Sequence, residues 1–109
     1  MDANATSDYN TAVGHQSLSA VNGDGVGGNT AVGYESGVAV TSGIANTLIG
    51  RGAGSTLTTS GSNTLIGYAA GNVIAAGQTT TDGTVAVGRS ALAALTTGAS
   101  NTAIGFHAG

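Results

Sequence analysis

The chain has 109 residues, 20 of them glycine, and it contains no proline, cysteine, tryptophan or lysine. Charged residues make up 6% and aromatic residues 4%, which excludes both a disordered, charge-rich chain and a globular core built on large rings. The formal net charge is −3, from two arginines against five acidic residues, so the composition offers no basic patch for nucleic acid.

Residues 1–9 precede the first repeat and are interpreted as an N-terminal tail or a partial rung. They lack the basic region and the apolar stretch of a secretory signal, and no apolar run in the chain is long enough to predict membrane insertion. Residues 10–109 are treated as a single repeat domain. Because neither end resembles the polar cap that a repeat array needs, we expect the chain to be a fragment of a longer rod.

A five-residue segment recurs six times along the chain. It reads Asn-Thr-Ala/Leu-Val/Ile-Gly in five copies and Thr-Val-Ala-Val-Gly in the fifth, at residues 10–14, 29–33, 46–50, 63–67, 84–88 and 101–105. The closing glycines are 19, 17, 17, 21 and 17 residues apart, so the base period is 17. The insertions fall at 22–28 and 78–83, whose sequences are typical of turns.

A second apolar position follows each of the first five closing glycines, at Val21, Val40, Leu57, Ile74 and Leu95. We therefore expect each unit to form a strand, a turn, a second strand and a second turn. Two short strands cannot bury a face alone, whereas units stacked at about 4.8 Å per rung share backbone ladders and one thin core. The prediction is an all-β parallel β-solenoid of about six 17-residue rungs.

Side chains alternate along each strand, so the β-branched residues face one way and the alanine or leucine faces the other. We expect the β-branched residues, such as Thr47 and Ile49, to fill the inside of the coil. The opposite face then forms an apolar strip, which normally marks an interface, and several copies around an axis would cover it. The expected trimer-interface residues are Ala12, Ala31, Leu48, Leu65, Ala86 and Ala103.

The segments at 29–33, 63–68 and 101–106, read as Asn-Thr-Ala/Leu-Val/Ile-Gly followed by an aromatic residue, resemble two known groups. One is the head domain of trimeric autotransporter adhesins, with its Ser-Val-Ala-Ile-Gly repeats. The other is the Asn-Thr-Ala-Ile-Gly-Tyr repeat of phage tail fibres, which is the closer match because the autotransporter repeat is shorter and has valine where this chain mostly has threonine.

The resemblance covers about residues 10–109 and implies a left-handed parallel β-roll assembled as a homotrimer. It also implies an extracellular location, on a virion tail fibre or a bacterial surface, and a structural and adhesive role. A host or cell-surface receptor, either glycan or protein, would be the partner of such a fibre.

Equivalent positions of a solenoid form columns, and the position after each closing glycine reads His15, Tyr34, Arg51, Tyr68, Arg89 and Phe106. At rung spacing we expect each guanidinium to lie over a neighbouring ring, a contact worth about 0.5–1 kcal/mol when exposed. Three interpretations are open. The column is a solvated arrangement that keeps like charges apart, a receptor- or glycan-binding stripe, or packing at the edge of a trimer.

A second column consists of asparagines, for which we expect a ladder of side-chain amides: Asn10, Asn29, Asn46, Asn63 and Asn101. Thr84 breaks this ladder beside the longest insertion, so that rung is expected to be the loosest. The glycine-rich stretch at 22–28 resembles part of a calcium-binding nonapeptide repeat. It has Asp24 as its one carboxylate, so we expect a loop there and no calcium.

No paired carboxylates, triad or metal cluster can be assembled from the repeats, so we expect neither an enzyme nor a cofactor. The predicted function is a structural and adhesive segment of a trimeric surface fibre. The alternative is an ice-binding β-solenoid, for which the threonines at 58–59, 79–81 and 96–97 hint at an array, although they shift in register. A third possibility is a spacer without a ligand.

Overall fold

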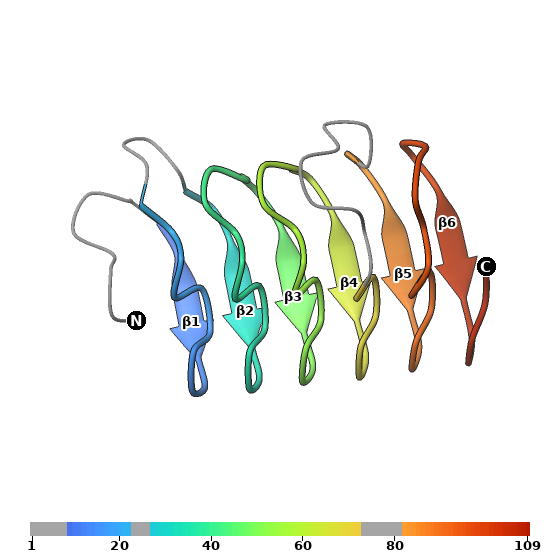
Figure 1. The fold of residues 1–109 in the computed structure, drawn as a ribbon, viewed down its shortest axis with the longest axis horizontal. Coiled ribbons are helices and arrows are strands. Elements are labelled where there is room, and N and C mark those ends of the chain that lie inside the picture. The colour runs from blue at the N-terminus through green and yellow to red at the C-terminus, as the bar shows by residue number, and fades with distance from the viewer. Residues whose placement is uncertain (1–8, 23–26, 73–81) are drawn as a thin grey trace.

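The structure is a computed structural model that describes residues 9–22, 27–72 and 82–109. It shows six parallel strands in one sheet, ordered along the sheet as they are along the chain (Figure 1). The strands are β1 (Thr11–Val13), β2 (Thr30–Val32), β3 (Thr47–Ile49), β4 (Thr64–Ile66), β5 (Val85–Val87) and β6 (Thr102–Ile104). Residues 1–8, 23–26 and 73–81, which include Asp24, Ile74 and the threonines at 79–81, lie outside the described residues.

Equivalent residues of successive repeats pair with one another throughout the sheet. Thr47 pairs with Thr64, Leu48 with Leu65 and Ile49 with Ile66. The same register holds across both insertions, because β1 pairs with β2, and β4 with β5, position by position. The predicted all-β parallel solenoid is therefore confirmed, and the extra residues leave the stacking of the strands unchanged.

Each rung carries one three-residue strand within the described residues, not the two strands that we expected. The second apolar positions do face the core, since Val40 and Leu57 are buried, but they lie outside the strands. The reason is a pair of left-handed residues after each strand, such as Glu35 at a φ of 54° and Gly37 at a φ of 60°. An extended chain cannot contain such residues, so the back of each rung is a series of turns.

The two faces of the strands are the reverse of our prediction. Ala31, Leu48, Leu65 and Ala86 are fully buried inside the coil, while Ala12 and Ala103, on the outermost strands, pack partly buried against the same core. The β-branched residues lie on the outer face instead, and Ile49 is 37% exposed. The column expected at a trimer interface is thus the core of a single chain and is not available to a partner.

Asparagine explains why this face turns inward. The backbone N–H and the Nδ2 of Asn46 both donate to Asn29 Oδ1 at 3.0 Å, and Nδ2 also donates to the Ser60 carbonyl at 2.9 Å. Asn46 Oδ1 in turn accepts the equivalent pair of hydrogen bonds from Asn63 at 3.0 Å. A carboxamide with all its polar atoms paired can be buried at little cost. Leu48 lies two residues after Asn46 and therefore faces the same way, so it is buried with it. The predicted amide ladder is confirmed from Asn10 to Asn63, whereas the Asn101 Nδ2 donates to the Gly98 carbonyl instead.

Thr84 interrupts the ladder where the sequence predicted. Its backbone N–H donates to Asn63 Oδ1 at 3.0 Å, as an asparagine there would, but its Oγ1 is buried and has no hydrogen-bond partner. The carbonyl equivalent to those that Asn29 and Asn46 reach, 14 residues further along the chain, belongs to Gly98 and accepts from Asn101 Nδ2. Rung five therefore contains an unpaired polar atom where rungs two and three have the fully paired amides of Asn29 and Asn46.

The substitution Thr84→Asn is expected to stabilise the chain by about 1–2 kcal/mol, because it removes a buried unpaired hydroxyl and extends the ladder. Urea unfolding followed by circular dichroism measures the change. Thr102→Asn is the matched control, because Thr102 lies on the outer face of β6 and is exposed, so its replacement should change stability by less than about 0.5 kcal/mol. A Thr84→Asn chain less stable than the wild type would contradict this account of the ladder.

Candidate functional site

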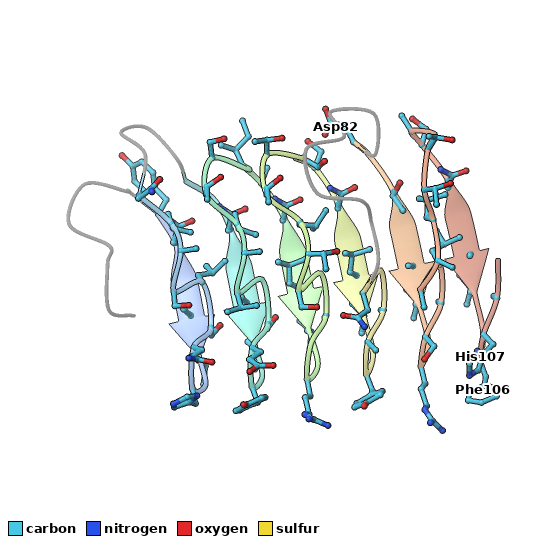
Figure 2. All side chains as sticks on the ribbon, viewed as in Figure 1. Asp82, Phe106 and His107 are labelled. Carbon is cyan, nitrogen blue, oxygen red and sulfur yellow. The ribbon has the colours of Figure 1, made fainter. Side chains whose placement is uncertain are left out.

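The side chains of His15, Tyr34, Arg51, Tyr68, Arg89 and Phe106 follow one another along one edge of the solenoid; we call them the ring-and-arginine column. Each comes directly after a closing glycine, such as Gly50 at a φ of 126°, where the chain leaves the strand and enters a turn. Figure 2 labels Phe106 at this edge and Asp82 at the opposite edge. In-register stacking therefore places one member of the column on every rung.

Both arginines lie between aromatic rings, as the sequence predicted. The Arg51 Cζ atom is 5.5 Å from the ring centroids of both Tyr34 and Tyr68. The Arg89 Cζ atom is 5.7 Å from the Tyr68 centroid and 5.4 Å from the Phe106 centroid. The expected alternation of cations and rings is confirmed, and four cation–π contacts restrain two side chains that would otherwise be free in solvent.

A histidine lies at each end of the column: His15 is its first member, and His107 contacts its last member, Phe106. The His15 ring stacks on Tyr34 with its centroid 5.6 Å away and the planes at 9°. At the other end, His107 meets the Phe106 ring edge-on, with centroids 4.2 Å apart and planes at 74°. Since the chain has two arginines, two histidines and no lysine, all of its basic side chains lie at this edge.

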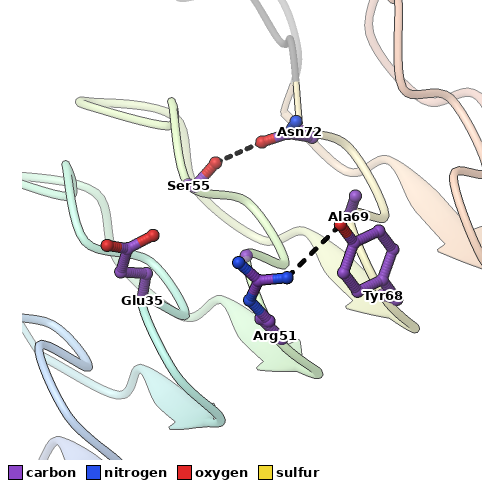
Figure 3. Close-up of a pocket in the computed structure, with 7 residues that line it drawn as sticks. Glu35, Arg51, Ser55, Tyr68, Ala69 and Asn72 are labelled. Atoms are coloured by element: carbon purple, nitrogen blue, oxygen red, sulfur yellow. Dashed lines mark hydrogen bonds between the residues drawn. The ribbon is translucent and has the colours of Figure 1, made fainter.

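A hollow of about 140 Å³ opens beside the column (Figure 3). Its polar walls are Glu35, Arg51, Ser55, Tyr68 and Asn72. Arg51 Nη1 is 3.5 Å from the Tyr68 hydroxyl, and Ser55 Oγ donates to Asn72 Oδ1 on the next rung. The hollow thus presents a carboxylate and a guanidinium on neighbouring rungs, with hydroxyl and amide groups beside them.

Glu35 also acts on the ring next to it. A hydrogen bond from the Tyr34 phenol to the Glu35 carboxylate raises the pKa of Tyr34, and the negative charge of Glu35 and slight burial raise it further, while Arg51 opposes the shift. The phenol therefore stays protonated well above neutral pH.

The sequence predicted the column but missed the hollow. Ser55 and Asn72 are one 17-residue period apart, so aligning the turns as well as the strands would have placed them side by side. Glu35 occupies the position of Gly52 and Ala69 in the following rungs, and all three have a positive φ. The small residues Gly52 and Ala69 leave room in front of Arg51. Comparing the sequences of the repeats alone does not reveal this space.

Comparison with known proteins finds no matching family model, no matching curated protein and no matching solved structure. In the described part of the chain, no group of three or more histidine, cysteine, aspartate or glutamate side chains is placed to hold a metal ion. Over the same residues, no helix is long and apolar enough to cross a bilayer. The structure itself defines the class of the protein, an all-β parallel repeat solenoid.

Proposed function

We propose that the chain is a structural and adhesive segment of a trimeric extracellular fibre, carried on a virion tail or on a bacterial surface. The fold supports the mechanical role, because successive rungs are joined by backbone ladders and, from Asn10 to Asn63, by an amide ladder. Such an array is a stiff rod whose rungs cannot unfold singly without exposing the core of their neighbours.

One observation carries the proposal. The outer face of the sheet bears an unbroken line of branched apolar side chains, the outer strip: Val13, Val32, Ile49, Ile66, Val87 and Ile104. Val13 is 57% exposed and Ile104 is 70% exposed, at the two ends of the sheet. A contiguous apolar strip on a regular sheet normally marks an interface. The outer strip is therefore the candidate interface, in place of the alanine and leucine column, which is buried in the core.

Sister chains would cover the outer strip by packing around a common axis. A cyclic arrangement lets the same strip of each copy meet its neighbours, which closes the assembly without leaving a free apolar edge. The copy number of three, the extracellular location and the adhesive role are supported by the resemblance of the repeats to phage tail fibres and adhesin heads. A host or cell-surface receptor would then contact the outward edges of the rod.

The substitution Ile49→Lys tests this interface. Placing an ammonium group in the centre of the outer strip should shift a trimer to monomers, with a dissociation constant raised roughly 100-fold or more, about 3 kcal/mol. Sedimentation equilibrium over a range of protein concentrations measures the effect. Ile44→Lys is the matched control, because Ile44 is 51% exposed but lies in a turn away from the strip. That variant should assemble like the wild type.

Two outcomes contradict the proposal. A monomeric mass for the unmodified chain at high micromolar concentration would remove the trimer. Loss of assembly in both lysine variants alike would show that the interface lies elsewhere than on the outer strip.

A second candidate function uses the same face. Thr11, Thr30, Thr47 and Thr64 form a regular column beside the outer strip, which Val85 interrupts before Thr102. This threonine column is a better candidate for an ice-binding array than the threonines at 58–59 and 96–97, because those residues lie outside the strands. Thermal hysteresis separates the two functions, because a fibre segment that hides this face in a trimer should produce none.

A further inference from the structure

We propose that the ring-and-arginine column binds a linear acidic polysaccharide, with carboxylates on Arg51 and Arg89 and a sugar ring over the hollow beside Arg51. The inference names the ligand of the adhesive role and rests on that part of the proposed function. It does not require the trimer, because all the groups involved belong to one chain.

Positive charge is gathered at this edge although the chain as a whole is acidic. Both arginines are exposed, and neither forms an ion pair among the described residues. Asp82 lies at the opposite edge of the solenoid (Figure 2). Because charges are screened over about 8 Å at physiological ionic strength, an anion near the column responds mainly to Arg51, Arg89 and the single Glu35 carboxylate beside the hollow, and much less to the net charge of −3.

The stacking prepares each guanidinium for a carboxylate. The Arg51 Cζ atom lies between the rings of Tyr34 and Tyr68, its Nη1 is 3.5 Å from the Tyr68 hydroxyl, and the exposed side chain lines the hollow. The N–H edge is the part of arginine that forms paired hydrogen bonds with a carboxylate. Since the rings already restrain the side chain, binding costs less conformational entropy than it would for a free surface arginine.

The spacing of the arginines selects an extended polymer. The register of β3, β4 and β5 places Arg51 and Arg89 two rungs apart. At about 4.8 Å per rung the separation is roughly 10 Å, close to the advance of an extended polysaccharide over one disaccharide. A chain with a carboxylate on every second sugar would therefore meet both guanidiniums while lying along the column.

The hollow adds recognition of hydroxyl groups. Its volume of about 140 Å³ is of the order of one sugar ring, and its walls include the Glu35 carboxylate, which accepts hydrogen bonds from hydroxyls, and the Asn72 amide. Tyr68 is not a stacking platform for a sugar, because Arg51 and Arg89 lie over its ring. Charge and hydroxyl contacts, not aromatic stacking, would therefore decide which glycan binds.

The test uses hyaluronan, which carries a carboxylate on every second sugar, and measures its binding to the whole chain by biolayer interferometry. The double variant Arg51→Gln/Arg89→Gln should bind at least tenfold more weakly, and wild-type binding should weaken as salt is added. Arg51→Lys/Arg89→Lys, which keeps the charge but loses the planar N–H edge, should lie between the two. Circular dichroism checks that each variant is folded, and the lysine variant still tests the site if the glutamine variant does not fold.

The matched control changes the net charge equally at the far edge. Ser42→Asp/Thr59→Asp also makes the chain more negative by two charges, at exposed turn positions close to Gly61, whose N–H donates to Asp82. This variant should bind hyaluronan within twofold of the wild type. A hyaluronan tetrasaccharide, with two carboxylates, should bind at least tenfold more tightly than the disaccharide, because the second contact becomes intramolecular.

Several results would overturn the inference: unchanged affinity after Arg51→Gln/Arg89→Gln, an equal loss in the aspartate control, equal binding of neutral dextran, or tighter binding of single-stranded DNA. Sedimentation of the same samples keeps the two proposals apart. A monomer that still binds hyaluronan through the arginines would refute the trimer alone, whereas a trimer that does not bind would refute this inference alone.

Discussion

Replacing Gly50 by alanine is expected to destabilise the chain by at least about 4 kcal/mol, enough to leave much of it unfolded, given a usual stability of about 5–15 kcal/mol. A Cβ atom on Gly50 would lie 2.5 Å from the carbonyl oxygen of Gly67 and 2.7 Å from its carbonyl carbon. Both are backbone atoms of the next rung. Since Gly67 N–H is itself bonded to the Ile49 carbonyl, the rungs cannot separate locally without breaking the ladder.

Gly105→Ala is the matched control. Gly105 has nearly the same backbone conformation as Gly50, with a φ of 130° against 126°. The nearest atom to an added Cβ, however, is the Ala108 Cβ at 3.8 Å, an ordinary contact. This variant should therefore show the backbone strain alone, about 1–2 kcal/mol.

Urea unfolding of both alanine variants separates the two costs. The difference between them measures how closely successive rungs approach one another at the closing glycine. An equal loss of stability in the two variants would show that backbone conformation alone, and not the packing of rung on rung, requires glycine at this position.

The period of the sequence was sufficient to predict how the rungs stack. Closing glycines 17 residues apart imply that equivalent residues lie above one another, and the strands pair in that register. The cation–π contacts follow from the same reasoning, because Tyr34, Arg51 and Tyr68 occupy one position of the repeat. Features that depend on alignment along the rod are therefore readable from one sequence.

The direction in which each strand faces was not readable in the same way. A period of two separates Thr47 and Ile49 from Asn46 and Leu48, but it does not say which pair lies inside. β-Branched side chains fit a strand on either face, and an asparagine is usually taken as a mark of solvent. Here the reverse holds, because the ladder satisfies the Asn46 carboxamide completely and the inside of the coil accepts leucine.

The prediction of a second strand in each rung was wrong for a related reason. The apolar spacing correctly places Val40 in the core, but spacing does not report backbone conformation. Left-handed residues such as Glu35 and Ala69 are not glycine, so the sequence gives no signal that the chain turns there. The hollow beside Arg51 depends on those turns and was missed with them.

Replacing Asn46 by alanine should destabilise the chain by about 3–5 kcal/mol, second only to the change at Gly50. Asn46 is fully buried, and its Oδ1 is the acceptor for the backbone N–H of Asn63. Removing the carboxamide leaves the Asn63 N–H without an acceptor inside the coil. It also removes one of the two donors to Asn29 Oδ1 and creates a small cavity. Because the ladder is continuous, neighbouring rungs lose hydrogen bonds as well as the rung that is changed.

Asn101→Ala is the control beyond the ladder, at the equivalent position of the last rung. Asn101 is only half-buried, and its Nδ2 donates to the Gly98 carbonyl three residues earlier. Its loss should cost about 1 kcal/mol, the net value of a single hydrogen bond. Chemical denaturation of both variants, with amide hydrogen exchange to locate the loosened rungs, makes the comparison. If Asn46→Ala cost no more than Asn101→Ala, the buried ladder would not be what orients the strands, and the inward face would need another cause.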